Sequence, residues 1–163
     1  MSFPDAEYFF RYQNRLIQDE LQYNRHALSQ EHIKLVSNLN DEQRYVYDIV
    51  MDAVKLNGGG MFFVYGYGGT GKTFVWKTLS TTLRSKGEIV LNVTLSGITY
   101  LFLPGGRTAY SKFVIPLNSN EDSTCNIKQG SPLAELIIRS NLIIWDEAHI
   151  MNKYCLEALD RSM

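Results

Sequence analysis

The sequence has few cysteines and no long apolar run, and both absences narrow the class of protein. It holds 2 cysteines, Cys125 and Cys155, and neither has a Cys or His neighbour at metal-ligand spacing. We therefore expect reduced structural thiols rather than a disulfide framework or a zinc site. Residues 1–5 lack a basic start and an apolar run, and no stretch approaches the length of a membrane span. These features predict an intracellular protein with no membrane partner.

The sequence also lacks an excess of either charge, since its formal net charge is -1. A basic field over the whole chain is thereby excluded, so any contact with nucleic acid has to come from a local cleft. The length of 163 residues, with 45% hydrophobic and 20% charged residues, is ordinary for one domain with its own core.

A glycine-rich loop at residues 66–73 has the spacing G-x-x-x-x-G-K-[ST]. Small residues let consecutive backbone N–H groups surround a polyphosphate, and the following helix directs its positive end at the same charge. Residues 61–65 are predicted to be a buried strand, and residues 74–86 a helix. The predicted nucleotide-binding residues of this loop are Gly66, Tyr67, Gly68, Gly69, Thr70, Gly71, Lys72 and Thr73.

Two residues of the loop have predicted chemical roles. Lys72 would neutralise the outer phosphates, and Thr73 would hold Mg²⁺. The alternative is a glycine-rich turn in which Lys72 is merely solvated. A lysine at a helix N-terminus opposes the helix macrodipole, so its position favours an anion beside it.

The apolar run that begins at residue 142 predicts a strand that delivers Asp146 and Glu147 at its carboxyl end. Ligands of open α/β sheets bind at that edge. Asp146 would belong to the Mg²⁺ shell, and Glu147 would polarise the attacking water. Adjacent acids after a strand are common, but together with the loop they predict nucleotide hydrolysis by Lys72, Asp146 and Glu147.

Several other segments show clear helix and strand patterns. Residues 7–25 and 30–38 are predicted to be helices of an N-terminal arm, residues 1–38, and residues 88–94 a strand. Residues 118–130 are predicted to be a surface loop, before a helix that Ser131 caps and that ends near Ser140. Residues 40–43 open another helix, which residues 57–60 end. In it, Gln43 has two interpretations: a capping-box partner of the Asn40 N–H, or a contact to an adenine edge.

Two segments have the residue types of a nucleic-acid contact. Ser96 and Gly97 follow the predicted strand, where free N–H groups could meet a phosphate, although an ordinary helix cap fits equally. Further on, cations alternate with aromatic residues, a pattern suited to backbone neutralisation and base stacking, with half-buried packing as the alternative. The residues of that pattern are Arg107, Tyr110, Lys112 and Phe113.

Residues 39–163 resemble the first RecA-like domain of the petite integration frequency (PIF) family of DNA helicases, especially its plant members. The resemblance rests on residues 39–44, 63–73, 103–109, 123–130 and 142–148. It implies an α/β fold of the P-loop NTPase (RecA-like) type, with a three-layer parallel sheet preceded by the helical arm.

The resemblance also implies a function. ATP and Mg²⁺ would be the cofactors, and single-stranded or forked DNA would be unwound from 5′ to 3′ in repair, recombination or telomere maintenance. The nucleus is the expected compartment, with an organelle as the alternative. The resemblance makes Gln43 an adenine contact as well as a cap. The predicted DNA-binding residues are Ser96, Gly97, Tyr110, Lys112 and Phe113.

Two features depart from the family pattern. Leu95 and Tyr110 replace a polar residue and a histidine in the segments that meet DNA in the family. The sequence also ends before the strand that follows Asp-Glu and before a second RecA-like domain. Residues 61–65 and 141–145 are therefore expected either about 10 Å apart or collapsed to about 4.8 Å. We expect such a fragment to be marginally stable and without independent helicase activity.

Two other functions remain open at this stage. One is a nucleotide-binding remnant without turnover. The other is a superfamily 2 RNA helicase, because Asp146, Glu147, Ala148 and His149 match the acidic motif of that class.

Overall fold

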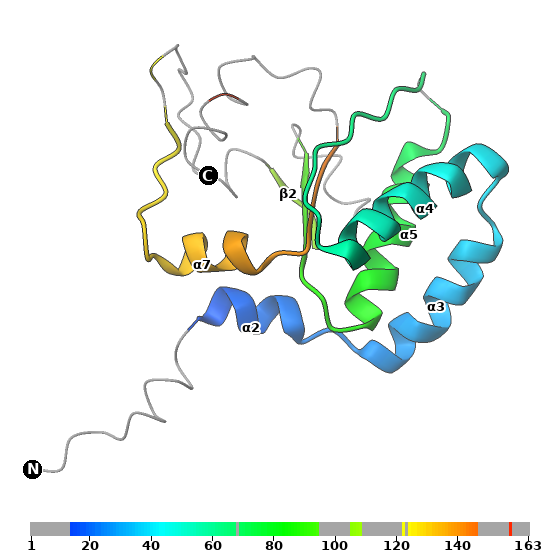
Figure 1. The fold of residues 1–163 in the computed structure, drawn as a ribbon. Helices are drawn as coiled ribbons and strands as arrows, with labels where there is room; N and C mark the ends of the chain where they lie inside the picture. The colour runs from blue at the N-terminus through cyan, green and yellow to red at the C-terminus, as the bar shows by residue number, and fades with distance from the viewer. Residues whose placement is uncertain are drawn as a thin grey trace, which may run out of the picture.

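The computed structural model describes residues 14–67, 69–94, 105–108, 122, 124–146 and 157, which form helices packed around a small parallel sheet (Figure 1). The elements are α2 (Arg15–Leu21), α3 (Arg25–Ser37), α4 (Asp41–Leu56), α5 (Lys72–Ser85), β1 (Val90–Thr94), β2 (Arg107–Thr108), α7 (Pro132–Arg139) and β3 (Leu142–Asp146). In Figure 1, α2 and α7 lie on one side of the strands, and α3, α4 and α5 lie on the other.

The strand β1 is central, because the order in the sheet is β2-β1-β3 and both pairings are parallel. Its residues, Val90 to Thr94, are all buried, as expected for a parallel strand with neighbours on both edges and helices on both faces. The register pairs Thr94 with Asp146. The carboxyl ends of β1 and β3 therefore reach the same edge of the sheet.

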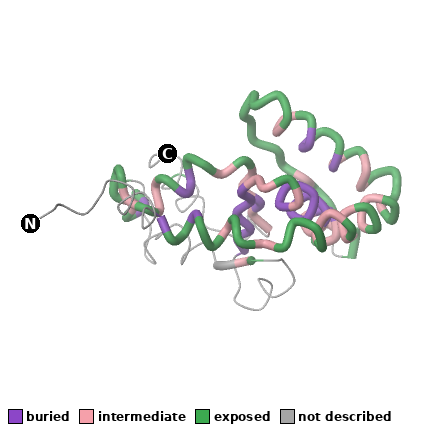
Figure 2. Tube along the Cα trace, turned by 90° about the horizontal axis from the view of Figure 1, so that it is seen from below, coloured by how far each residue is buried: buried purple, intermediate pink, exposed green. Residues whose placement is uncertain are grey.

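Two hydrophobic clusters pack against alternate residues of β1. Leu91 and Val93 belong to a cluster with Leu136 of α7, whereas Val90 belongs to a second cluster with Leu79 of α5. Since successive side chains of a strand point to opposite faces, the two clusters lie on opposite faces of the sheet. Figure 2 shows the buried residues gathered in the strands and along α5, with exposed residues on the outer helices.

The N-terminal helices differ from the prediction. One helix was expected over residues 7–25, but α2 ends at Leu21 and α3 begins at Arg25 instead of at residue 30. The break has a local cause: Asn14 and Asn24 each accept a backbone N–H bond, which starts a separate helix at each asparagine. Apolar periodicity across residues 16–28 concealed this break. Residues 7–13 lie outside the described residues. The boundary between the helical arm, residues 1–38, and the domain that begins at residue 39 stays a prediction.

Both helices of the N-terminal segment pack on the rest of the chain. The helix α3 lies along α5, and α2 lies against α7. The Asn14 amide donates to the Pro132 carbonyl at 2.7 Å and to the Glu135 carboxylate at 3.2 Å. The side chain that caps α2 therefore also fixes α2 to the first turn of α7.

The prediction of a buried strand at residues 61–65 is wrong. These residues form no strand, and Met61, Phe63 and Tyr65 are 76%, 71% and 94% exposed. A short apolar run shows that a segment could be buried, but a strand also needs an edge with which to pair. Among the described residues, β3 pairs with β1 and not with residues 61–65, so the collapsed arrangement is not formed.

The remaining described elements agree closely with their local signals. The helix α4 begins with the predicted capping box of Asn40 and Gln43, and ends at Asn57 in the left-handed conformation. Ser131 caps α7 by accepting the Ala134 N–H, with Pro132 in the first turn. Cys125 is buried in the cluster that contains Leu91.

Taken together, the described helices and strands, with their small parallel sheet, are compatible with part of a RecA-like fold. No helix in the described ranges is both long and apolar enough to cross a membrane.

Candidate nucleotide-binding site

The loop that precedes α5 requires glycine at several positions. Gly69 and Gly71 have φ angles of 86° and 76°, a region that residues with a Cβ rarely adopt. A Cβ on Gly66 would lie 2.7 Å from the Thr70 hydroxyl oxygen. Thr70 closes a turn, since its N–H and its hydroxyl both donate to the Tyr67 carbonyl, at 3.3 and 2.9 Å. Side chains at these glycine positions would therefore prevent the compact conformation of the loop.

The loop leads directly into the N-terminus of α5. Gly71 is the residue before the helix, and it supplies no side-chain cap for the backbone N–H groups of the first turn. Lys72 is the first helical residue, and its ammonium donates to the Gly66 carbonyl across the loop at 2.6 Å. An ammonium has three donors, so Lys72 can keep this bond and still contact an anion. Thr73 follows, with an exposed side chain.

Gln43 connects α4 to the loop. Its amide oxygen accepts the Asn40 N–H at 3.1 Å, which completes the capping box. Its amide nitrogen lies 3.4 and 3.5 Å from the carbonyl oxygens of Thr70 and Gly71, and a Cβ on Gly71 would collide with that nitrogen. The interpretation of Gln43 as a capping-box residue is therefore confirmed, and its amide nitrogen faces the loop. Contact with an adenine stays a prediction.

Asp146 lies at the carboxyl end of β3, where its carboxylate Oδ1 accepts a bond from the Trp76 indole Nε1–H at 3.2 Å. Trp76 lies one turn after Lys72 on α5, so both side chains project from the same face of that helix. In the described residues no hydrogen bond joins Asp146 to Thr73. Trp76 is not among the predicted site residues, and no local pattern in the sequence indicates its bond to Asp146, 70 positions away.

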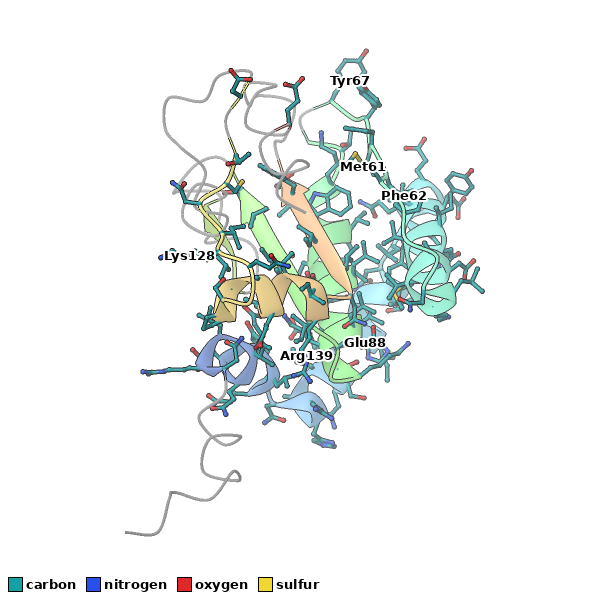
Figure 3. All side chains as sticks on the ribbon, turned by 60° about the vertical axis from the view of Figure 1, so that its left-hand side comes forward. Met61, Phe62, Tyr67, Glu88, Lys128 and Arg139 are labelled. Atoms are coloured by element: carbon teal, nitrogen blue, oxygen red, sulfur yellow. The ribbon has the colours of Figure 1, made fainter. Side chains whose placement is uncertain are left out.

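The tip of the loop is strongly exposed. Tyr67 is 91% exposed, and Figure 3 shows its ring at the outer end of the loop, pointing away from the rest of the molecule. Met61 and Phe62, which precede the loop, lie between it and α4 in the same view. Residues 66, 67, 69 and 70 are all exposed, so a ligand can reach the loop from solvent.

The residues present fit a nucleotide with a divalent cation. An ammonium and an uncapped helix N-terminus suit phosphates, and the Asp146 carboxylate with the Thr73 hydroxyl are oxygen ligands of the kind that Mg²⁺ prefers. Lys72 and Asp146 are connected through α5 and the side chain of Trp76. Several predicted site residues lie outside the described ranges: Gly68, Ser96, Gly97, Tyr110, Lys112, Phe113 and Glu147. The side chain of Arg107 is also outside them.

Comparison with known proteins shows the family to which the chain belongs. Residues 38–163 match the sequence profile of the PIF1-like helicases, which covers most of the chain, and the chain therefore belongs to the PIF1-like helicase family. The chain is similar to the ATP-dependent DNA helicase PIF4 of Trypanosoma brucei brucei (strain 927/4 GUTat10.1), with 29% identity over 126 residues. That alignment covers 75% of this chain and 14% of the trypanosome protein.

Proposed function

We propose that this chain carries the ATP site of a DNA helicase, in which ATP hydrolysis drives strand separation in the 5′ to 3′ direction. The observation that supports it best is the connection between the loop and the acidic strand end. The helix α5 begins at Lys72 and binds Asp146 through Trp76 one turn later. Membership of the PIF1-like helicase family and the name of the trypanosome relative, an ATP-dependent DNA helicase, support this proposal.

Each described residue of the site has a role in the proposal. Lys72 would neutralise the outer phosphates of ATP. Thr73 and Asp146 would hold Mg²⁺, which when bound balances the charge of those phosphates. The long contacts of the Gln43 amide nitrogen with the loop are weak, so this nitrogen could turn to an adenine edge while the amide oxygen keeps the cap. Glu147 would polarise the attacking water.

The finer description of the fold is also proposed. Residues 39–163 would form a RecA-like domain with helices on both faces of its sheet, preceded by the arm of residues 1–38. The two hydrophobic clusters on opposite faces of β1 support this layered arrangement. The packing of α3 on α5 indicates that the arm folds together with the domain.

Contact with single-stranded or forked DNA is proposed for Ser96, Gly97, Tyr110, Lys112 and Phe113. The support is positional, since β1 ends at Thr94, opposite Asp146, and the chain reaches Ser96 two residues later. A DNA segment bound there would lie near the proposed ATP site. Repair, recombination or telomere maintenance would be the process, in the nucleus or alternatively in an organelle.

The test uses a protein that contains this chain together with a second RecA-like domain. The parent should unwind a duplex with a 5′ single-stranded tail in an ATP-dependent reaction, and a duplex with a 3′ tail much less. Lys72→Ala should lose this activity. Lys77→Ala is the matched control, because Lys77 lies on the same helix in an exposed ion pair with Glu31. Equal unwinding by the parent and Lys72→Ala would contradict the proposal.

A second candidate is nucleotide binding without turnover. It is favoured by the exposure of residues 61–65, because the segment ahead of the loop is not held in the described sheet. Turnover measurements on the 163-residue chain with and without single-stranded DNA separate the two candidates. Binding with no DNA-stimulated turnover in both this chain and the longer protein would support the second. The RNA helicase alternative has no support from the family match, which is to PIF1-like helicases.

A further inference from the structure

The contact between Trp76 and Asp146 joins α5 and β3 through two residues that are 70 positions apart in the sequence. The indole Nε1–H of Trp76 donates to Oδ1 of Asp146 at 3.2 Å. Trp76 is half-buried and packs against the cluster that contains Val75 and Leu79 of its own helix and Ile144 of β3. The ring is therefore supported by the core, while its N–H points to the end of β3.

This arrangement restricts the orientation of the carboxylate. An indole nitrogen is only a donor, so the bond has one direction, and it engages Oδ1 of Asp146. A carboxylate has a second oxygen and further lone pairs on both. With Oδ1 held by the indole, the carboxylate can still coordinate a cation through its remaining lone pairs without breaking the bond.

The helix α5 carries both Lys72 and Trp76, so it fixes the distance between these two residues of the site. Lys72 begins α5, and Trp76 follows one turn later on the same face. The ammonium end of the site and the anchor of its carboxylate are therefore carried by one rigid element. Thr94 lies beside Asp146 on the neighbouring strand and is buried, so the strand end itself is also held.

We propose that Trp76 is a positioning residue that orients the Asp146 carboxylate for a divalent cation. The inference rests on the proposed function, because it assigns the cation to the nucleotide site described above. Partners that orient a ligand residue typically change metal affinity by about 10-fold to 100-fold when they are removed. Loss of the indole N–H should weaken cation binding by this factor, and nucleotide binding without metal should stay unchanged.

The decisive variant removes the N–H and keeps the shape of the ring. The chain has 2 tryptophans, so a Trp145→Phe parent leaves Trp76 as its one indole. In that parent, Trp76 can be replaced by 3-benzothienylalanine, in which sulfur stands in place of the N–H. Trp76→Phe is the simpler companion variant. Each is compared with the Trp145→Phe parent, so that any effect of the background cancels.

Mn²⁺ binding is measured by electron paramagnetic resonance in the presence of a non-hydrolysable ATP analogue. We expect Mn²⁺ to bind about 10-fold to 100-fold more weakly to the benzothienyl variant. Affinity for the analogue in the presence of chelator should match that of the parent. An unchanged Mn²⁺ affinity would overturn the proposal. So would a loss of metal-free nucleotide affinity and of the thermal midpoint as large as the loss of Mn²⁺ affinity, because Trp76 would then be a packing residue.

A second measurement needs no ligand. In the ¹⁵N spectrum of the Trp145→Phe parent, the single indole N–H signal should move upfield with Asp146→Asn, because an amide oxygen accepts more weakly than a carboxylate. A signal that does not move would show that the bond is absent in solution. If the bond is present but the parent binds no nucleotide, the proposed function fails and the cation role fails with it. If the parent binds nucleotide and the variant binds Mn²⁺ equally well, the positioning role alone fails.

Discussion

Arg84→Ala should destabilise the chain more than any other single charge removal on α5. Arg84 is 2% exposed, and its guanidinium donates to the Val90 carbonyl at 3.0 Å. The same group forms an ion pair with Glu20 at 3.6 Å and lies 4.4 Å from the centre of the Tyr23 ring. It thus connects α5 and β1 to α2, through Glu20, and to Tyr23 in the bend that follows α2.

The expected magnitude follows from the burial of this cluster. The Arg84 and Glu20 side chains are 1% and 12% exposed, so removal of the cation leaves a largely buried carboxylate without this counter-charge. Breaking a buried pair in this way costs about 3 to 5 kcal/mol. Burial lowers the pKa of Arg84, while the nearby Tyr23 and Glu20 act in the opposite direction. Arginine starts from so high a pKa that the group stays charged near neutral pH.

Urea unfolding followed by circular dichroism measures the effect as a change in the free energy of unfolding. Lys77→Ala is the control, since its ion pair with Glu31 at 3.3 Å is 40% and 45% exposed and should contribute less than about 1 kcal/mol. Glu20→Gln should cost less than Arg84→Ala, because the guanidinium keeps its bond to Val90. A change for Arg84→Ala no larger than that for Lys77→Ala would refute the argument from burial.

Four further changes test other parts of the account. Asn40→Ala removes a side-chain cap and should lower the free energy of unfolding by about 1 kcal/mol, measured by urea unfolding. Gly71→Ala should weaken nucleotide binding in a titration, because a Cβ collides with the Gln43 amide at a φ angle of 76°. Glu147→Gln, in a protein with both RecA-like domains, should retain ATP binding and lose turnover. In that protein, alanine at Tyr110 and Phe113 should weaken single-strand binding by about 1 to 3 kcal/mol each, with DNA-free ATP affinity unchanged.

The elements that the sequence predicted well have local causes. The capping box of Asn40 and Gln43, and the Ser131-Pro132 start of α7, depend on residues within one turn of each other. The loop before α5 is specified by glycines whose positive φ angles can be expected from the motif itself. The strand β3 is a short apolar run that finds an edge of β1. For the caps and the loop the information lies within a few neighbouring residues, whereas β3 also depends on the edge that β1 offers.

The features that the sequence did not predict depend on distant partners. The run at residues 61–65 is as apolar as β3, yet it pairs with no strand in the described part of the sheet. The break between α2 and α3 is an exception with a local cause, because the cap at Asn24 competes with helical periodicity on both sides. The bond from Trp76 to Asp146 joins residues 70 positions apart, which no local pattern encodes. Burial and pairing are properties of the whole fold.

The most direct test of the central claim is calorimetric titration of the 163-residue chain with a non-hydrolysable ATP analogue and Mg²⁺. We predict that the parent and Lys77→Ala bind the analogue with equal affinity. Lys72→Ala should bind it at least about tenfold more weakly, because a charged hydrogen bond contributes about 1.5 to 3 kcal/mol. Equal affinity of Lys72→Ala and the parent would contradict the assignment of the loop at residues 66–73 as the ATP site.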